Sequence, residues 1–196
     1  MAVGTIPLAV SDEALLKQAV AGDREALDEL FKRYRLLAFR VAHRLLGNEA
    51  DALDAVQEAF IKALVHLPSF QGRSSFKTWM LRVVSNAALD LGRQRGRREV
   101  LSLDSLSSNY REDAEPRTYP DPCRDLERQD MRRTLQEALA QLPLAQRQTF
   151  VLHAEAELSY REVAETLGIS IGTVMSRLYY ARLRLRTLLE PWMKNE

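Results

Sequence analysis

The chain has a single cysteine and no long apolar run. Cys123 is the only cysteine among 196 residues, which excludes a disulfide framework and a thiolate-rich metal site. No apolar run approaches the roughly 20 residues needed to span a bilayer. The N-terminus also lacks the basic segment and apolar core of a signal peptide. We therefore expect a cytoplasmic protein that does not insert into a membrane.

Signals of catalysis are also missing. His43, His66 and His153 are isolated, without the spacing of a metal-binding pair. The chain has neither a glycine-rich phosphate loop nor the nucleophile elbow of hydrolases. Cys123 lies in an acidic stretch, which is a poor place to orient a nucleophile. These absences predict a protein that is not an enzyme and that needs no metal or cofactor.

Charge of one sign is not in excess, because 28 basic residues face 27 acidic ones. The distribution along the chain is nevertheless uneven. Arginines cluster over residues 93–98 and again over residues 177–186, and residues 99–125 between them hold seven acidic residues against three arginines. This pattern predicts two modules that face polyanions, joined by a solvated tether.

Apolar residues recur at helical spacing through most of the chain, and no strand-like alternation competes with them. Between residues 100 and 122 the pattern gives way to serine, acidic residues and proline, which predicts irregular structure. We expect an all-α fold of two small helical domains, residues 12–98 and 125–190, joined by a flexible acidic linker over residues 99–124. The helices are expected over residues 12–21, 25–46, 49–67, 75–95 and most of 124–189.

Residues 158–186 fit a helix-turn-helix. Ser159 and Glu162 have the spacing of a capping box, Gly168 provides a sharp helix end, and Ser170 can cap the second helix. That helix is expected to bury Val174, Leu178 and Ala181 and to present Thr173, Ser176, Arg177 and Tyr180 outward. An outward face of this kind suits the DNA major groove. The other interpretation is an ordinary helical hairpin with a basic outer face.

The helix that contains Asp51 is amphipathic. Its expected buried face is Ala52, Ala55, Val56, Ala59, Phe60 and Ala63. Its opposite face carries Asp54, Gln57, Glu58 and Ile61, three or four residues apart. From these residues alone a solvated face with one exposed aliphatic is the simpler interpretation, and a docking surface is the alternative.

The helix over residues 75–95 has a second polar stripe. Its expected core face is Met80, Val83, Val84, Ala87, Ala88 and Leu91, and Arg82, Ser85, Asn86 and Arg93 lie opposite. Phe76 and Trp79 are expected in the core. A polar loop with an aromatic residue precedes the helix, and aromatic and amide groups together suit the capture of unstacked bases. Phe70 and Asn86 are the better candidates for that contact.

Three segments resemble, in fixed order, the extracytoplasmic-function (ECF) group of bacterial sigma-70 factors. They are DALDAVQEAF (51–60), SFKTWMLRVVSNAALD (75–90), and LPLAQRQTFVL (142–152) followed by the helix-turn-helix. The resemblance covers nearly the whole chain. It implies a promoter-specificity subunit whose partners are core RNA polymerase, promoter DNA and an anti-sigma factor.

The resemblance also implies roles for individual residues, and it favours the docking interpretation of the Asp54 stripe. The implied contacts with core polymerase are made by Asp51, Asp54, Gln57, Glu58 and Ile61. The implied contacts with melted −10 DNA are made by Phe70, Arg73, Arg82, Asn86, Arg93 and Arg95. The implied contacts with −35 duplex are made by Ser170, Thr173, Ser176, Arg177, Tyr179, Tyr180 and Arg182. The acidic linker would thread the RNA exit path of the polymerase.

The sequence departs from the family pattern at three positions. Leu53 stands where a carboxylate is usual, and Met175 and Tyr180 stand where lysine or arginine is common. A methionine neither neutralises a phosphate nor makes a bidentate contact to guanine. We therefore expect a −35 preference that differs from the usual one.

Two other functions fit parts of the sequence. A helix-turn-helix regulator would use residues 12–98 for sensing or dimerisation, and would bind duplex promoter DNA tightly without polymerase. A helical adaptor would bind only proteins, and neutralising Arg177 and Arg182 would leave its function intact.

Overall fold

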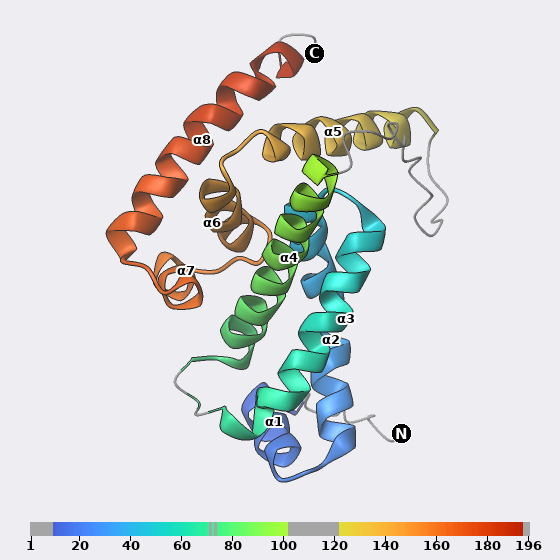
Figure 1. Ribbon diagram of the computed structural model, residues 1–196, viewed down its shortest axis with the longest axis vertical. Helices are drawn as coiled ribbons and strands as arrows, with labels where there is room; N and C mark the ends of the chain where they lie inside the picture. The colour runs from blue at the N-terminus through green and yellow to red at the C-terminus, as the bar shows by residue number, and fades with distance from the viewer. Residues whose placement is uncertain (1–9, 71, 73, 102–121, 194–196) are drawn as a thin grey trace, which may run out of the picture.

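The computed structural model describes residues 10–70, 72, 74–101 and 122–193, and within them every regular element is helical. This confirms the predicted all-α class. Figure 1 shows the order of the elements along the chain. They are α1 (Asp12–Val20), α2 (Arg24–Leu46), α3 (Glu49–His66), a 3-10 turn (Leu67–Ser69), α4 (Phe76–Leu101), α5 (Pro122–Ala140), α6 (Leu144–Ala154), α7 (Tyr160–Leu167) and α8 (Ile171–Met193).

Local signals in the sequence determine where the helices begin and end. Asp23 caps α2, because its Oδ1 accepts from the backbone N of Glu25 at 2.9 Å. The same helix ends at Gly47, whose φ of 86° is costly for any residue with a Cβ. In contrast, α4 extends to Leu101 and α5 begins at Pro122, both within the residues assigned to the linker. Glutamate and leucine at the end of α4 continue a helix readily, and proline is tolerated in the first turn of α5. The rest of that linker, residues 102–121, lies outside the described residues.

The N-terminal half is a bundle in which α4 lies between α2, α3 and the C-terminal half (Figure 1). The predicted inner faces of α3 and α4 are confirmed as buried, with Phe60, Val83 and Leu91 partly exposed. Small residues let α3 and α4 pack closely, since Ala55 and Ala59 of α3 and Ala87 and Ala88 of α4 are fully buried. Phe76 and Trp79 belong to this core as predicted.

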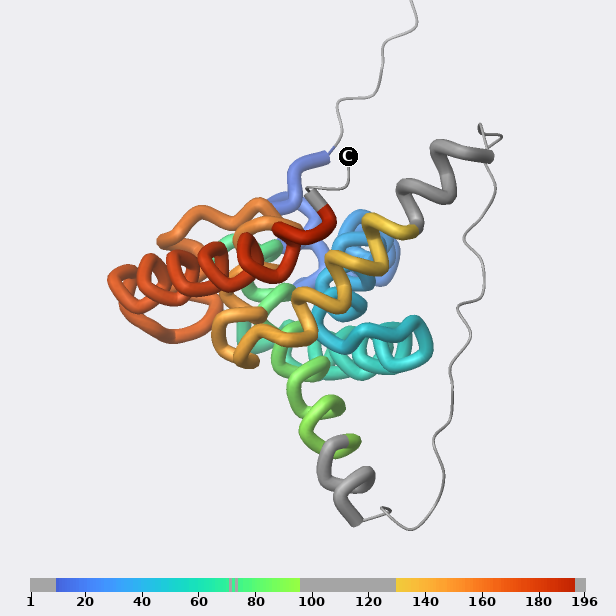
Figure 2. Tube along the Cα trace, turned by 90° about the horizontal axis from the view of Figure 1, so that it is seen from above, coloured from blue at the N-terminus to red at the C-terminus, as the bar shows by residue number. Residues whose placement is uncertain are grey.

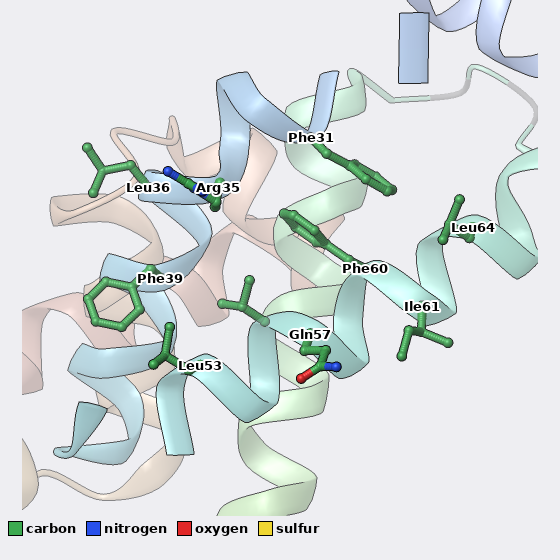
Figure 3. Close-up of a pocket in the computed structure, with 10 residues that line it drawn as sticks. Phe31, Arg35, Leu36, Phe39, Leu53, Gln57, Phe60, Ile61 and Leu64 are labelled. Atoms are coloured by element: carbon green, nitrogen blue, oxygen red, sulfur yellow. The ribbon is translucent and has the colours of Figure 1, made fainter. Parts of the chain in front are cut away.

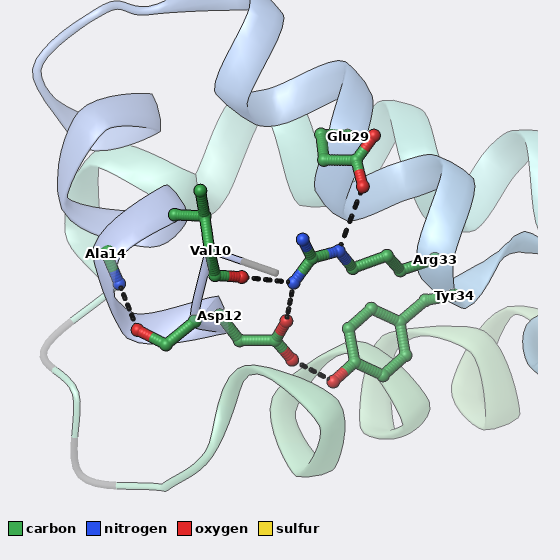
Figure 4. Close-up of polar contacts among 7 residues, drawn as sticks. Val10, Asp12, Ala14, Glu29, Arg33 and Tyr34 are labelled. Atoms are coloured by element: carbon green, nitrogen blue, oxygen red, sulfur yellow. Dashed lines mark hydrogen bonds and ion pairs between the residues drawn. The ribbon is translucent and has the colours of Figure 1, made fainter. Parts of the chain in front are cut away.

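A polar network attaches α1 to α2 (Figure 4). Arg33 donates from Nη1 to the carbonyl of Val10 at 2.7 Å and to Oδ1 of Asp12 at 2.9 Å, and from Nε to Glu29 at 3.0 Å. The hydroxyl of Tyr34 donates to the other carboxylate oxygen of Asp12. Burial, followed by this hydrogen bond, raises the pKa of Tyr34. The guanidinium of Arg33 and the neutral phenol of Tyr34 therefore share the carboxylate of Asp12.

The C-terminal half contains the predicted helix-turn-helix, formed by α7 and α8. The Ser159 Oγ accepts from the Glu162 backbone N at 3.3 Å, and the Glu162 carboxylate accepts from the Ser159 backbone N at 2.8 Å. Gly168 ends α7 with a φ of 65°. Val163, Val174 and Leu178 are buried where the two helices cross. The predicted capping box, turn and crossing are therefore all confirmed.

Replacing Ser159 with alanine is expected to lower the stability of this unit by about 1 kcal/mol, because an N-cap hydrogen bond is lost. For a chain of this size the melting temperature should fall by roughly 2–4 °C. The hydrogen bonds from Ser159 lower the pKa of Glu162. The contribution of the ionised carboxylate is therefore complete above its unfolded pKa, and it disappears as pH falls through the lowered folded pKa. Thermal melts at neutral and acidic pH would measure both effects, and an unchanged neutral melt would contradict the prediction.

The two halves pack directly on each other. One hydrophobic cluster runs from α2 and α4 into α6 and α7, and includes Leu152, Leu158 and Val163. Helix α7 lies against α4, and α6 lies against α2. Figure 2, seen from above, shows α6, α7 and α8 on one side of α4 and α2 and α3 on the other. The sequence predicted two modules joined by a linker. The structure also packs the two modules against each other through an apolar interface that was not predicted.

Candidate functional site

The outer face of α3 is exposed as predicted. Asp54, Gln57, Glu58 and Ile61 all face outward, and Ile61 is 55% exposed. The Glu58 carboxylate pairs with Lys62 one turn later at 2.6 Å. The stripe therefore combines carboxylates, an amide and an aliphatic side chain on one accessible surface.

Asp51, in contrast, does not belong to this surface. It is 3% exposed at the first turn of α3, where it accepts from Asn48 Nδ2 at 2.7 Å and forms an ion pair with Arg95 of α4. The prediction that Asp51 contacts a partner is not supported by this position. Its carboxylate instead binds the Asn48 side chain at the start of α3. The ion pair with Asp51 also occupies Arg95, which was predicted to bind DNA.

An apolar groove lies between α2 and α3, beside the predicted stripe (Figure 3). It has a volume of about 720 Å³. Its lining includes Leu36, Leu53, Gln57, Ile61 and Leu64. The rings of Phe31 and Phe60 stack in it with centroids 4.5 Å apart. Of this lining, only Gln57 and Ile61 were predicted from the sequence to contact a partner.

Several aliphatic groups in the groove face solvent. Leu36 is 64% exposed, Leu53 is 53% exposed and Leu64 is 46% exposed. Exposed aliphatic side chains gathered in one concave surface are typical of a protein interface, whereas single ones are ordinary. Leu53, which departs from the family pattern, therefore extends the apolar surface where a carboxylate would have added charge.

The polar stripe of α4 is also accessible. Arg82, Asn86 and Arg93 are exposed, and Arg93 pairs with Asp90 at 3.4 Å. Ser85 is buried, so its predicted place on the polar side is wrong. Its hydroxyl donates to the Arg82 carbonyl at 3.3 Å, which satisfies it inside the core.

Phe70 lies at the start of the loop that precedes α4. Its ring and that of Trp79 meet edge to face, with centroids 5.1 Å apart, and Trp79 in turn packs on Phe76. Phe70 is half-buried, so the structure supports one side of the ring and leaves part of it accessible. Arg73 lies outside the described residues.

The outer face of α8 carries the remaining predicted residues. Ser170 caps the helix, accepting from the Thr173 backbone N at 3.1 Å, and its hydroxyl lies 2.8 Å from that of Thr173. Ser176, Tyr179, Tyr180 and Arg182 are exposed, and Arg177 is half-buried. The rings of Tyr179 and Tyr180 meet edge to face at 5.3 Å. Arg182 also reaches the Tyr160 hydroxyl at 3.5 Å, which links α8 to α7.

An apolar strip, which was not predicted from the sequence, runs along one flank of the outer face of α8. Ile171 is 47% exposed, Met175 is 54% exposed and Tyr179 is 63% exposed. These residues are four apart and therefore line up along the helix. Arg182 and Arg186 are exposed and continue the same line over the next two turns of the helix. The line is thus apolar in its first half and basic in its second.

Neither a metal cluster nor a membrane span occurs in the part of the chain that the structure describes. No group of histidine, cysteine and acidic residues there could hold an ion. None of the described helices is long and apolar enough to cross a bilayer.

Comparison with known proteins matches both halves. The Sigma-70 region 2 family matches residues 30–98, and the Sigma-70 region 4 family matches residues 132–185. The ECF RNA polymerase sigma factor SigE of Mycolicibacterium smegmatis is 36% identical, over 86% of this chain and 64% of its own length. The chain thus spans a little under two thirds of that relative. The ECF RNA polymerase sigma-E factor of Haemophilus influenzae is 30% identical, over 94% of this chain and 98% of its own.

Two solved structures share the fold. CnrH in complex with the cytosolic domain of CnrY has a TM-score of 0.70 and 26% identity, covering 92% of this chain and 97% of that one. The sigma factor RpoE of Bartonella quintana, in complex with the anti-sigma factor NepR, has a TM-score of 0.63 and 26% identity, covering 83% and 97%. With both family regions in order and the Haemophilus influenzae relative matched along 98% of its length, the chain belongs to the ECF group of the sigma-70 family, the alternative sigma factors that direct transcription initiation.

Proposed function

We propose that three exposed surfaces of the chain each bind a different component of the initiation complex. The α2–α3 groove with its polar stripe binds core RNA polymerase, the α4 stripe holds the melted −10 strand, and the outer face of α8 reads the −35 duplex. The observation that carries this proposal is the groove. A concave apolar surface edged by Asp54 and Glu58 fits a helical partner that carries aliphatic and basic side chains.

We assign these three surfaces to the two predicted domains. Residues 12–98 would hold the polymerase and −10 surfaces, residues 125–190 the −35 surface, and the acidic linker would thread the RNA exit path. The protein would act in the cytoplasm, where polymerase and chromosome are, and would not itself be an enzyme. Two similar structures contain a second protein bound to the sigma factor, so an anti-sigma factor is a proposed partner here as well.

Run-off transcription with purified core polymerase tests the proposal directly. The chain should allow core to initiate at promoters that core alone does not use. Promoters are obtained by mapping transcription starts after overexpression in the host. Tight binding of duplex promoter DNA by the free chain, without any polymerase-dependent product, would favour the helix-turn-helix regulator instead.

The −10 surface is suited to a flipped base. The Phe70 ring, supported by Trp79 at 5.1 Å, offers a stacking surface, and the exposed Asn86 amide can both donate and accept. Stacking on an aromatic ring contributes about 1–3 kcal/mol per base. This contribution offsets the cost of unstacking the base from the duplex.

The −35 surface is expected to contact thymine methyl groups, because Met175 and its neighbours form an apolar strip and the thymine methyl is the apolar group in the major groove. Replacing a contacted thymine with uracil removes only that methyl group. Initiation should fall about fourfold, from roughly 0.8 kcal/mol for one buried carbon. The loss should disappear in Met175→Ala.

Uracil placed between the two promoter elements is the matched control and should have no effect. Run-off yield from templates with single uracils measures the contact. A uracil effect that is the same in the parent and in Met175→Ala would assign the methyl contact to another residue.

A further inference from the structure

Two methionine side chains are exposed in the part of the chain that the structure describes. Met175, on α8, is 54% exposed, and Met131, on α5, is 51% exposed. A third, Met80 of α4, is fully buried in the core. Peroxides dissolved in water can reach an exposed thioether and oxidise it to a sulfoxide. Met131 and Met175 are therefore open to oxidation, whereas Met80 is protected.

Met175 differs from Met131 in its surroundings. It lies in the apolar strip of α8, with Ile171 one turn before it and Tyr179 one turn after it. Helix α8 runs along the outer edge of the molecule (Figure 1). Met131, in contrast, is followed by the exposed Arg132, and α5 takes no part in the three surfaces proposed above. Of the two methionines, Met175 is the one whose apolar character the proposed function uses.

The −35 contact proposed for Met175 depends on that apolar character. The strip is expected to cover thymine methyl groups in the major groove, and the covered groups lose their contact with water. Lysine and arginine, which are common at this position in the family, carry no sulfur. The methionine that gives the strip its apolar centre therefore also makes the strip sensitive to an oxidant.

Hydrogen peroxide alone balances the oxidation of the thioether. A sulfur lone pair attacks one oxygen of the peroxide, so that an S–O bond forms while the O–O bond breaks. The second oxygen leaves as water after a proton transfer. The sulfur loses two electrons and the peroxide gains them. The product is a sulfoxide, which puts a polar, hydrogen-bond-accepting group where the side chain had been apolar.

We propose that Met175 is a peroxide-oxidisable site through which an oxidant lowers −35 recognition. The sulfoxide oxygen would lie against the thymine methyl, which offers it no hydrogen-bond donor. Because a polar group covered without a partner is unfavourable, binding of the −35 element should weaken about tenfold. Methionine sulfoxide reductases reverse the change, since two thiols become a disulfide and the sulfoxide oxygen leaves as water. The inference rests on the proposed reading of the −35 duplex by α8.

Peptide mass spectrometry after peroxide treatment of the free chain tests the accessibility of the site. The chain carries Cys123→Ser so that no thiol competes for the oxidant, and catalase removes the peroxide before any other protein is added. The peptides that contain Met131 and Met175 should gain one oxygen well before the peptide that contains Met80. A Met175 that reacts no faster than Met80 would overturn the proposal.

Run-off transcription with each treated chain and untreated core polymerase tests the consequence. The yield from the oxidised parent should fall about tenfold relative to its own untreated sample. Sulfoxide reductases for both epimers should restore it. Titration with core polymerase should give the same affinity before and after oxidation, because α8 lies outside the α2–α3 groove.

Two leucine variants assign the effect to one sulfur. Met131→Leu removes the other exposed thioether and is the matched control, so it should show the same fall as the parent. Met175→Leu keeps an apolar side chain without sulfur, and its treated and untreated samples should initiate equally. An equal fall in Met175→Leu, or no fall in the oxidised parent, would contradict the proposal.

The thymine and uracil templates separate this inference from the −35 proposal. If the untreated chain distinguishes the two templates but the oxidised chain still initiates fully from thymine, the −35 proposal stands and the inference alone fails. If the untreated chain initiates equally from both templates, Met175 does not contact the methyl group, and the −35 contact and the inference are both wrong.

Discussion

Replacing Leu53 and Ile61 with aspartate is expected to weaken binding to core RNA polymerase by about three orders of magnitude while the chain stays folded. Both side chains are more than half exposed in the free protein, at 53% and 55%, so the bundle core does not depend on them. In the complex they would be covered, and a buried carboxylate without a partner is costly. Apolar residues at the centre of an interface contribute about 2 kcal/mol each. The pair should therefore cost roughly a thousandfold in affinity.

Val65→Asp is the matched control. Val65 is 70% exposed at the end of the same helix, but it does not line the groove. Biosensor titration with core polymerase should separate the two changes, with Val65→Asp binding like the parent. If the double aspartate variant kept its affinity, the polymerase would have to dock elsewhere on the chain.

Replacing Arg82 and Asn86 with alanine should slow promoter opening about a hundredfold and leave closed-complex formation nearly unchanged. Both side chains are exposed on α4, and in the proposed complex they contact the −10 strand only once it is single. Losing a base contact of 1–3 kcal/mol together with a charged contact to the backbone accounts for that factor.

Permanganate reactivity of unpaired thymines, followed in time, measures the opening. Filter binding at low temperature measures the closed complex. Arg133→Ala is the matched loss of an exposed cation, on α5, and should leave both steps intact. A parallel fall in both measurements for the α4 variant would mean that these residues bind duplex DNA instead of the melted strand.

Features that depend on neighbouring residues could be predicted from the sequence. The Ser159–Glu162 capping box and the turn at Gly168 each need residues only a few positions apart. The buried alanines of α3 follow from helical periodicity in the same way. Such signals are local, because the partners are fixed by the geometry of a single helix or turn.

Features that join distant segments could not be predicted. The groove needs Leu36 of α2 beside Leu53 of α3, and neither position shows this in its own helix pattern. Asp51 has the acidic character of its neighbours, yet it is buried because Arg95 of α4 reaches it. The sequence around Arg147 predicts an ordinary surface cation, whereas the fold places its guanidinium against the carbonyl of Leu45 at the end of α2.

The attachment of α1 determines the smallest N-terminal fragment worth purifying. The Sigma-70 region 2 family match begins at residue 30, whereas Arg33 and Tyr34 take their partners from Val10 and Asp12. A truncation at residue 30 would leave a guanidinium and a phenol without their shared carboxylate. It would also uncover the apolar surface that Leu15 and Ala19 now bury. Expression boundaries drawn from family resemblance alone would thus remove a structural part of the bundle.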